Sequence, residues 1–476
     1  MTHLTAPTSQ KTSMSTSSVF SQSPDYPIKQ FRLAFSNWYT QSQGQESPEK
    51  AGETELLVEA SILVDGEVIG RITFDGKSQV AIRPGQNSWS DPFPVPNWQR
   101  KHFEVRTFSK VQEGSAKVTS YRVKSSGDSG GLGVHYSSSI ETHQSLLAGA
   151  PLNNNGYSSF RHYFGPSAMV TDGWDGRDVV LIVGDSIGFG DYFGRSFVTQ
   201  GLSLMPTRTP FINLSVQGTR PSDQSSKERG AFAFKSGLID DVTDMNGGTP
   251  GFTQILSQHG ANDAHAKDGQ RLFGKLKVFW KFLNNQWPEI PITQTTLTPK
   301  TKKNSRWYQS RLSQQSSFSP PGSDRWQLED RLHPLPKELH SIINLREAWT
   351  GSKNGWRWRE LSCNAKLQGP VSRGEQALQV SSPLPEGAKL VIAPGTDSAE
   401  ATYGDVINIT STPTSYLVEL SSPLKSDHEK GTDVFCTMSR DGTHPTGSYA
   451  LSFGAEVINQ WRHQYLKLNS NTQDVL

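Results

Sequence analysis

The chain has 476 residues, of which 34% are hydrophobic and 19% are charged, and its formal net charge at pH 7 is +2. This length predicts roughly two to four folded units, and the near balance of charge excludes a general electrostatic attraction to nucleic acid or anionic lipid. The sequence contains no uninterrupted apolar run near the ~20 residues that a membrane-spanning helix needs, which excludes an integral membrane protein of that kind.

The N-terminal segment is rich in hydroxyl side chains. Residues 1–24 include 12 Ser or Thr and few apolar side chains, so they cannot bury enough surface to offset the entropy of ordering. We interpret residues 1–25 as a flexible arm or an attachment segment that orders only on a partner. The segment lacks the basic and then apolar layout of a secretory signal, so we expect any export to use a route other than a standard cleaved signal.

Residues 26–147 have the pattern of short β-strands. Two β-rich segments, 56–64 and 67–74, flank Asp65-Gly66, which is a strong hairpin signal. Further strand-like segments, separated by turn-forming residues, follow at 79–84, 102–111 and 117–123. Several short strands at this spacing predict a β-sandwich domain of roughly 100 residues.

A different pattern begins near Asp178. The run 178–186 is apolar until it ends in Gly-Asp-Ser, as expected of a strand that is buried on both faces in a parallel sheet. Helical periodicity is present at 268–287 and 447–466. Strands that alternate with helices predict an α/β domain with a doubly wound, flavodoxin-like parallel sheet of about five strands. The expected core strands are 178–186, 211–216, 252–258, 290–297 and 434–438.

These patterns divide the rest of the chain into three parts. Residues 148–364 are expected to form the first part of the α/β domain, and residues 434–476 to return to it with the last strand, a loop and a C-terminal helix. Strand-like segments within 365–433 predict a small inserted β subdomain. Residues 299–335 are polar with little periodicity and predict a long excursion from the core.

The chain has two cysteines, Cys363 and Cys436. Two thiols do not make a metal cage by themselves, and no neighbouring His spacing completes one. The pair fits either a single disulfide or two buried free thiols. Because no secretory signal is visible, the sequence favours free thiols.

Four motifs that follow predicted core strands are expected to meet at one edge of the sheet. Gly-Asp-Ser places Ser186 at the carboxyl edge, where open α/β folds build their sites, and near a helix N-terminus suited to negative charge. Later strands lead to Gly218, whose N–H no side chain shields, and to Asn262, whose amide is a donor. After the last strand, Asp441 lies three residues before His444, so that the carboxylate can fix the imidazole tautomer.

The order and spacing of these motifs resemble the SGNH hydrolase family, also called GDSL-like esterases, over residues 178–466. The resemblance implies a serine esterase in which Ser186 attacks the ester carbonyl, His444 accepts its proton and Asp441 orients the imidazole. It also implies an oxyanion hole made by the N–H groups of Ser186 and Gly218 and the side-chain amide of Asn262. No metal or organic cofactor is expected.

The chain departs from the family pattern in two places. Ile187 stands where the first motif usually has Leu, which affects only the packing behind the nucleophile. The distance between the third and last motifs is lengthened by the excursion and the inserted subdomain, and this lengthening bears on substrate access.

A looser resemblance concerns the arrangement of the whole chain. A β-rich N-terminal region followed by this hydrolase is similar to phage-associated SGNH proteins, which implies an extracellular or virion-associated location and phage structural proteins as partners, with a cytoplasmic location as the alternative. With the tryptophan-containing loops near residues 299–335, it predicts O-acetyl groups on a bacterial surface polysaccharide as the substrate. Two alternatives stay open: a lipid or small acyl ester hydrolase, and a virion structural or adsorption protein that uses the hydrolase-like domain for glycan binding.

Simpler roles stay open for single site residues. Ser186 also fits a helix cap, Gly218 a turn residue and Asn262 a loop cap. Asp185 and Asp263, which are next to site residues, are expected to hold the loops through hydrogen bonds to the backbone and not to take part in chemistry.

Other histidines compete with His444 for the role of base. Asp330 and His333 repeat its spacing, although no strand-like run precedes them. His259 and His265 flank the Asn262 motif, and we interpret both as ordinary loop residues.

Tryptophans and lysines near the excursion suggest a sugar platform or an attraction to an acidic polysaccharide. Core packing of the tryptophans and a solvated face for the cations are the simpler interpretations. The residues concerned are Trp307, Trp326, Trp349, Trp356, Trp358, Lys300, Lys302, Lys303 and Arg306.

Overall fold

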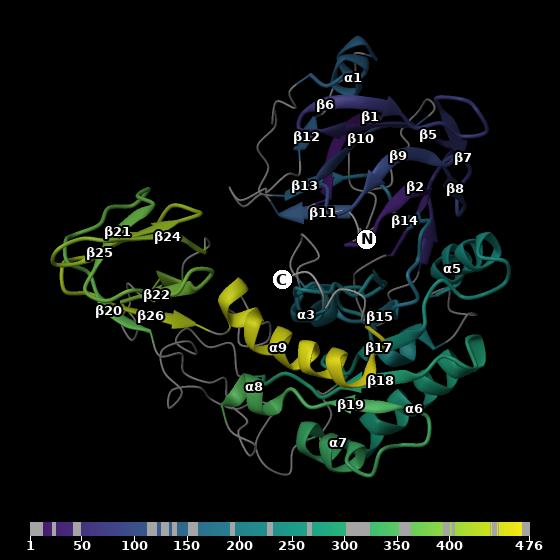
Figure 1. The fold of residues 1–476 in the computed structure, drawn as a ribbon. Coiled ribbons are helices and arrows are strands. Elements are labelled where there is room, and N and C mark those ends of the chain that lie inside the picture. The colour runs from purple at the N-terminus through teal and green to yellow at the C-terminus, as the bar shows by residue number, and fades with distance from the viewer. Residues whose placement is uncertain are drawn as a thin grey trace.

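The computed structural model describes residues 13–20, 25–40, 49–111, 121–124, 133–135, 140–150, 160–190, 196–225, 232–263, 269–300, 324–351, 363–393, 400–401, 405–437, 439, 445 and 447–468. Figure 1 shows these residues in three groups of elements: antiparallel strands from the first third of the chain, a parallel sheet flanked by helices, and a smaller group of strands set to one side.

Within the described ranges, the first group contains fourteen strands and one helix. They are β1 (Ser13–Phe20), β2 (Ile28–Ser36), β3 (Trp38–Thr40), β4 (Glu49–Ala51), β5 (Leu56–Val64), β6 (Glu67–Arg71), β7 (Val80–Ile82), β8 (Asn87–Trp89), β9 (Phe93–Trp98), β10 (Phe103–Val111), β11 (Tyr121–Lys124), β12 (Gly133–His135), α1 (Ile140–Leu147), β13 (Phe160–Tyr163) and β14 (Ala168–Thr171).

Two antiparallel sheets dominate this group. One has the order β12-β1-β10-β5-β6, with β7 also paired to β5, and the other has the order β14-β2-β8, with β9 also paired to β2. Side chains of both sheets, such as Phe31 on β2 and Ile62 on β5, belong to one hydrophobic cluster. The predicted hairpin is present between β5 and β6, where Asp65 and Gly66 adopt positive φ angles of 52° and 83°.

Two expectations about this region need correction. Residues 13–20, which we expected in a flexible arm, form β1, and β1 pairs with β10 on one side and with β12 on the other. Main-chain pairing on both edges orders this Ser-rich segment without requiring it to bury a large apolar surface. The boundary expected at residue 147 also lies too early, because β13 pairs with β11 and β14 pairs with β2.

The parallel sheet has the strand order β16-β15-β17-β18-β19, and all its pairs are parallel. Its strands are β15 (Val180–Gly184), β16 (Phe211–Asn213), β17 (Gln254–Gln258), β18 (Ile292–Thr295) and β19 (Ser341–Ile343). The surrounding helices are α2 (Ser186–Phe189), α3 (Phe197–Leu202), α4 (Pro221–Gln224), α5 (Ala233–Met245), α6 (Gly269–Gln286), α7 (Asp324–Leu332), α8 (Arg346–Thr350) and α9 (Ser448–Tyr465).

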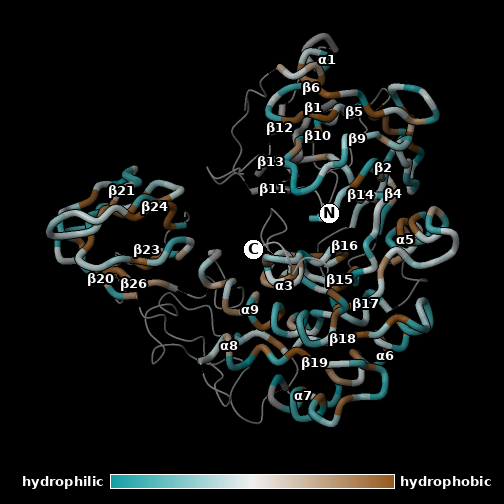
Figure 2. Tube along the Cα trace, in the orientation of Figure 1, coloured by the Kyte–Doolittle hydropathy of each residue, from teal (hydrophilic) through white to brown (hydrophobic). Residues whose placement is uncertain are grey.

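Helices cover both faces of this sheet, as predicted for a doubly wound fold. Along β15, Val180 and Ile182 join a cluster that includes residues of α3, α8 and α9, whereas Leu181 and Val183 join a cluster that includes residues of α6 and α7. Since successive side chains point to opposite faces, both faces of the strand need apolar residues. In Figure 2, brown marks the hydrophobic residues along the central strands of this sheet.

The fifth core strand was wrongly identified from the sequence. The described part of that segment, residues 434–437, does not join the parallel sheet. β26 (Asp433–Thr437) instead pairs antiparallel with β20 (Asn364–Lys366) and β22 (Lys389–Ile392). The fifth parallel strand is β19, which has only three residues and pairs with β18. Such a short strand leaves almost no periodicity in the sequence.

α3 and α9 approach each other closely at Gly201. A Cβ atom added to Gly201 would lie 2.5 Å from the main-chain oxygen of Ala455 and 2.5 Å from Cβ of Ile458. We predict that Gly201→Ala lowers the free energy of unfolding by about 1–3 kcal/mol, because the helices must move apart.

Equilibrium unfolding in urea measures this effect. The matched control is Gly237→Ala on α5, where an added Cβ meets nothing within 4 Å, and this variant is expected to gain about 0.5–1 kcal/mol. A Gly201→Ala protein as stable as the wild type would contradict the close approach of the two helices.

The third group consists of two small sheets between α8 and α9. Their orders are β20-β26-β22-β23 and β21-β25-β24. The remaining strands are β21 (Ala377–Val380), β23 (Glu400–Ala401), β24 (Val406–Ser411) and β25 (Tyr416–Leu420). The strands expected at 388–393, 405–409 and 415–420 correspond to β22, β24 and β25.

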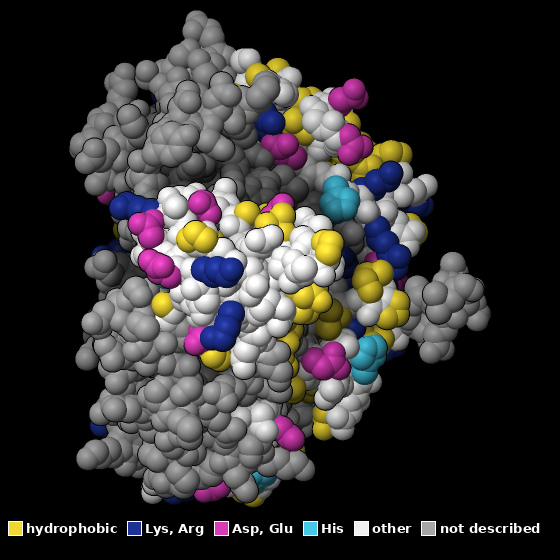
Figure 3. Space-filling view, turned by 90° about the vertical axis from the view of Figure 1, so that its left-hand side faces the viewer, with side chains coloured by type: hydrophobic (Ala, Val, Ile, Leu, Met, Phe, Trp, Pro, Cys, Tyr) yellow, Lys and Arg dark blue, Asp and Glu magenta, His cyan; other side chains and the backbone are white. Residues whose placement is uncertain are grey.

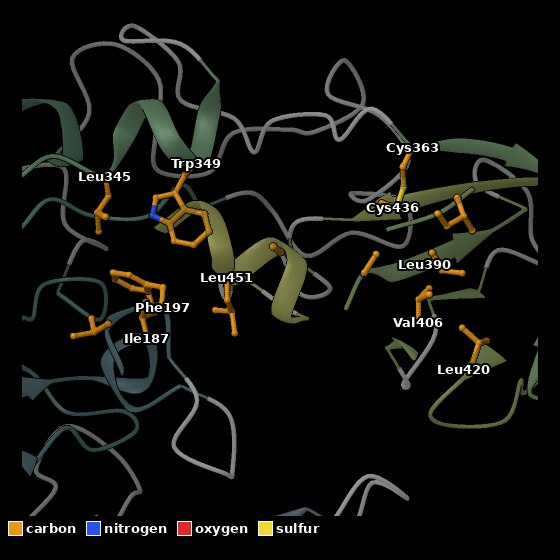
Figure 4. Packing of buried hydrophobic residues seen from close by; sticks show 14 of the residues in the cluster. Ile187, Phe197, Leu345, Trp349, Cys363, Leu390, Val406, Leu420, Cys436 and Leu451 are labelled. Carbon is orange, nitrogen blue, oxygen red and sulfur yellow. A yellow bond between two sulfur atoms is a disulfide. The ribbon is translucent and has the colours of Figure 1, made fainter. Parts of the chain in front are cut away.

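Cys363 and Cys436 form a disulfide, with their Cα atoms 5.6 Å apart, so the expectation of free thiols is wrong. The pairing of β20 with β26 explains their meeting. Asn364 is opposite Phe435, and the N–H of Cys436 donates to the carbonyl of Cys363. Figure 4 shows the disulfide beside Leu390 in the small sheets, and Trp349 facing Phe197 near Leu451 in the α/β part.

α5 attaches the α/β part to the first group of strands. The carboxylate of Glu49, on β4, accepts hydrogen bonds from the main-chain N–H groups of Phe234 and Lys235 and lies 3.5 Å from the Lys235 ammonium. Both side chains of this ion pair are buried. Burial raises the pKa of Glu49 and lowers that of Lys235, and the attraction between the two charges opposes both shifts. Trp38 also stacks on Phe234.

None of the helices in the described ranges combines the length and apolar character needed to cross a membrane.

Candidate active site

Ser186 lies at the carboxyl end of β15, where the strand passes into α2. Asp185 is the N-cap of α2, and its carboxylate accepts a hydrogen bond of 2.9 Å from the N–H of Ile187. Ser186 is the first residue of the helix and is partly exposed. Because Asp185 caps the helix, capping does not explain the serine. The cap also agrees with the backbone role expected for Asp185.

The segment after β16 forms a second part of this edge. The N–H of Val216 donates to the carbonyl of Gly184 at 3.0 Å, which ties the segment to the end of β15. Residues 216–219 then turn, with a φ of +79° at Gly218, a conformation that favours glycine. Gly218 is exposed, and a Cβ added there would meet nothing within 4 Å. The turn therefore presents Gly218 at the surface.

Asn262 follows β17 and contacts the turn at Gly218. Its Nδ2 donates a hydrogen bond of 3.0 Å to the main-chain oxygen of Thr219. Gly260 begins the segment with a φ of +127°, and a Cβ added to it would lie 2.9 Å from Leu297. The positive φ at this position favours glycine, and the segment that begins there brings Asn262 beside Thr219.

The structure brings together three of the five predicted site residues. Ser186, Gly218 and Asn262 come from three neighbouring parallel strands and share one edge of the sheet. Asp441 and His444 lie outside the described residues. On either side of them, Ser439 and Pro445 face each other in an isolated β-bridge, and α9 begins at Ser448.

A buried polar layer lies beneath the Ser186 turn, and sequence reasoning missed it. A Cβ added to Gly188 would lie 2.9 Å from both the Ser215 Oγ and the Gln258 Oε1 atoms. Gly184 is packed equally closely against this layer, because a Cβ added to it would lie 2.9 Å from the same Ser215 oxygen. Two glycines thus let α2 sit directly on polar side chains of the neighbouring strands.

His259 directly follows β17, and its burial corrects our interpretation of it as an ordinary loop residue. Its ring is buried, its Nε2 lies 2.7 Å from Gln224 Oε1, and it meets Phe279 edge to face. Burial, with a smaller contribution from the Lys235 charge, lowers the pKa of His259 to about 3. A neutral imidazole therefore supports the segment that carries Asn262. His265 lies outside the described residues.

This pKa shift makes stability depend on pH. Between the ordinary pKa of histidine and the lowered value, the unfolded chain binds a proton that the folded chain does not, so acid favours unfolding. We predict that the free energy of unfolding falls by about 2 kcal/mol between pH 7 and pH 5 because of His259.

Urea unfolding at the two pH values measures the change. In His259→Gln, the loss between pH 7 and pH 5 should shrink by most of that amount. His463→Gln, at an exposed position of α9, should leave it as in the wild type. The same pH dependence in the wild type and in His259→Gln would contradict a neutral, buried His259.

The structure also locates the remaining residues that the sequence suggested for the site or for glycan binding. Asp263 forms an ion pair with Lys275 of α6, so its carboxylate binds a side chain and not the loop backbone that we expected. Asp330 and His333 are exposed at the end of α7. Trp349 is fully buried, in agreement with core packing. Residues that lie outside the described ranges are Trp307, Trp356, Trp358, Lys302, Lys303 and Arg306.

Within the described part of the chain, no group of three or more His, Cys, Asp or Glu side chains is arranged to hold a metal ion.

No family model matches the sequence, and no curated protein matches it. Among solved structures, the chain is similar to a GDSL-like lipase from Bacteroides thetaiotaomicron, at 12% identity and a TM-score of 0.28 over 60% of this chain and 88% of the other. A lipase/acylhydrolase from Enterococcus faecalis matches at 16% identity and a TM-score of 0.23, over 38% and 87%. A salicylyl-acyltransferase from a tetracycline biosynthetic pathway matches at 12% and 0.25, over 72% of each chain. These identities and TM-scores are too low to assign a family or an activity.

Proposed function

We propose that the chain is a serine esterase of the SGNH type that hydrolyses carboxylic esters. The observation that carries the proposal is the meeting of Ser186, Gly218 and Asn262 at one carboxyl edge of the parallel sheet. Hydrogen bonds join the three segments, from Val216 to Gly184 and from Asn262 to Thr219. Open α/β sheets bind their ligands at this edge.

The proposed reaction follows from the chemistry of these groups. The Ser186 oxygen attacks the ester carbonyl carbon while the His444 imidazole takes the hydroxyl proton, and Asp441 stabilises the resulting cation. The tetrahedral intermediate collapses, the carbon–oxygen bond to the alcohol breaks, and His444 returns the proton to the leaving oxygen. Water then attacks the acyl-enzyme by the same route, which releases the acid and regenerates Ser186.

In this scheme, three donors stabilise the oxyanion. They are the main-chain N–H groups of Ser186 and Gly218 and the second hydrogen of the Asn262 amide, since the first is directed at Thr219. Because α2 has only four residues, we assign the contribution of Ser186 to its own N–H group and not to a long helix dipole. Donors fixed in advance need no reorganisation as negative charge develops.

We propose an O-acetyl group on a bacterial surface polysaccharide as the substrate, with a virion-associated role in which the N-terminal sheets act as a β-sandwich appendage. This finer proposal rests on the resemblance of the chain arrangement to phage-associated proteins. Figure 3 adds support from the face that carries the small sheets: its described side chains are mostly uncharged, with scattered cations and anions. Such a surface favours a neutral acetylated glycan over a strongly acidic one.

Hydrolysis of p-nitrophenyl acetate by the wild type and by Ser186→Ala tests the proposed function. We expect turnover in the wild type and a loss of about 10³-fold or more in the variant, because the nucleophile is absent. Ser452→Ala, at an exposed position of α9, is the matched control and should keep wild-type activity. Equal rates in the wild type and Ser186→Ala would contradict the proposal.

A further inference from the structure

Thr219, one residue after Gly218, contacts all three segments of the candidate site. Its side chain is buried, with 1% of the residue exposed. The hydroxyl oxygen lies 2.8 Å from the carbonyl oxygen of Val216 and 3.2 Å from that of Gly184. Its main-chain oxygen accepts the hydrogen bond from Asn262. No motif in the sequence distinguishes this threonine from an ordinary turn residue.

The hydroxyl holds the Gly218 turn against the strand that carries the nucleophile. Gly184 is the last residue of β15 and lies two positions before Ser186. A single O–H shared between the carbonyls of Gly184 and Val216 closes the turn and ties it to β15 at the same time. The position of the Thr219 main chain is therefore fixed relative to the nucleophile.

The main-chain oxygen of Thr219 in turn orients the Asn262 amide. A primary amide has two hydrogens on its nitrogen, and the bond to Thr219 occupies one of them and limits rotation of the amide group. The second hydrogen then points in a fixed direction, as an oxyanion donor requires. Asn262 is partly exposed, so an amide without this bond would rotate and bind water instead.

We propose that Thr219 is a positioning residue that sets the direction of the Asn262 amide relative to Ser186. The inference rests on the proposed esterase function and adds to it a residue that does not contact the substrate and acts mainly through the Asn262 amide. The hydroxyl is the important group, because it fixes the main-chain oxygen that Asn262 contacts.

Kinetics of p-nitrophenyl acetate hydrolysis by Thr219→Val and Thr219→Ser test the proposal. Valine keeps the shape but removes the hydroxyl, and we expect kcat to fall at least about fivefold with KM changed less than twofold, since a transition-state contact is weakened. Serine keeps the hydroxyl, and kcat should stay within about twofold of the wild type. Thr293→Val is the matched control, because Thr293 is also 1% exposed and its hydroxyl bonds to Ser341 at 2.7 Å. It should leave kcat unchanged.

A double-mutant cycle separates positioning from a general loss of structure. In an Asn262→Ala background, Thr219→Val should lower kcat by a clearly smaller factor than in the wild type, because the amide that it positions is gone and only its contacts with the Gly218 turn remain. A reduction by the same factor in both backgrounds, or an unchanged kcat in Thr219→Val alone, would overturn the inference while leaving the esterase proposal intact. Absence of Ser186-dependent turnover in the wild type would overturn both.

Discussion

Asn262→Ala is expected to lower kcat for ester hydrolysis by about 10²–10³-fold, which corresponds to about 2.7–4 kcal/mol of lost transition-state stabilisation. The reason is geometric. The Asn262 amide lies at the same sheet edge as Ser186, with one N–H bound to Thr219. Its other N–H meets negative charge only when the tetrahedral intermediate forms, so the loss should fall on kcat and not on KM.

Steady-state kinetics with p-nitrophenyl acetate measure this change. Asn246→Ala is the matched control, because the Asn246 amide also donates to a main-chain oxygen, that of Thr249, but at an exposed site after α5. Its kcat should equal that of the wild type. If Asn262→Ala kept kcat within twofold of the wild type, the amide would have no place in the oxyanion hole.

Glu49→Gln is expected to lower the free energy of unfolding by about 3–5 kcal/mol. The substitution removes the anion that faces the buried Lys235 ammonium and weakens the acceptor for the first N–H groups of α5. An uncompensated buried cation is costly, whereas a pair replaced on both sides by groups of similar volume is often neutral. The double variant Glu49→Gln/Lys235→Met should therefore recover most of the loss.

Urea unfolding of Glu49→Gln, Lys235→Met and the double variant measures the coupling free energy between the two side chains. Asp433→Asn is the matched control, because it breaks an exposed ion pair with Lys366 whose side chains are 51% and 60% exposed. That change should cost at most about 1 kcal/mol. A Glu49→Gln protein with the stability of the control would show that the contact between β4 and α5 does not hold the two parts of the chain together.

Elements with a strong local signal were predictable from the sequence. The hairpin at Asp65-Gly66 and the central strand β15 have such signals, and the turn and the strand formed as expected. The helix expected at 268–287 is α6, with Leu276 and Phe279 fully buried on the predicted face.

Elements defined by distant partners were not predictable. β19 has three residues and is recognisable only from its pairing with β18. β26 has a short run of apolar residues, as a buried parallel strand would, but it pairs antiparallel with β20 and β22. The disulfide joins residues that are 73 positions apart in the sequence and depends on that same pairing.

The candidate site likewise has a part that the sequence predicts and a part that it does not. The position of Ser186, Gly218 and Asn262 at one edge of the sheet was predictable, because each follows a core strand and parallel strands end at one edge. Their roles in catalysis stay predictions. The contacts of Thr219, Ser215, Gln258 and His259 join different loops and leave no pattern in the sequence. Asp441 and His444 remain predictions from their motif.

Labelling with a fluorophosphonate tests the central claim, that Ser186 is a nucleophile, most directly. An activated serine oxygen attacks the phosphorus and expels fluoride, so the adduct marks the nucleophile whatever the natural substrate is. Mass spectrometry of the full chain should find one label, located on the peptide that contains Ser186, and Ser186→Ala should remain unlabelled. A folded wild-type protein that takes no label, or a label on another residue, would contradict the account.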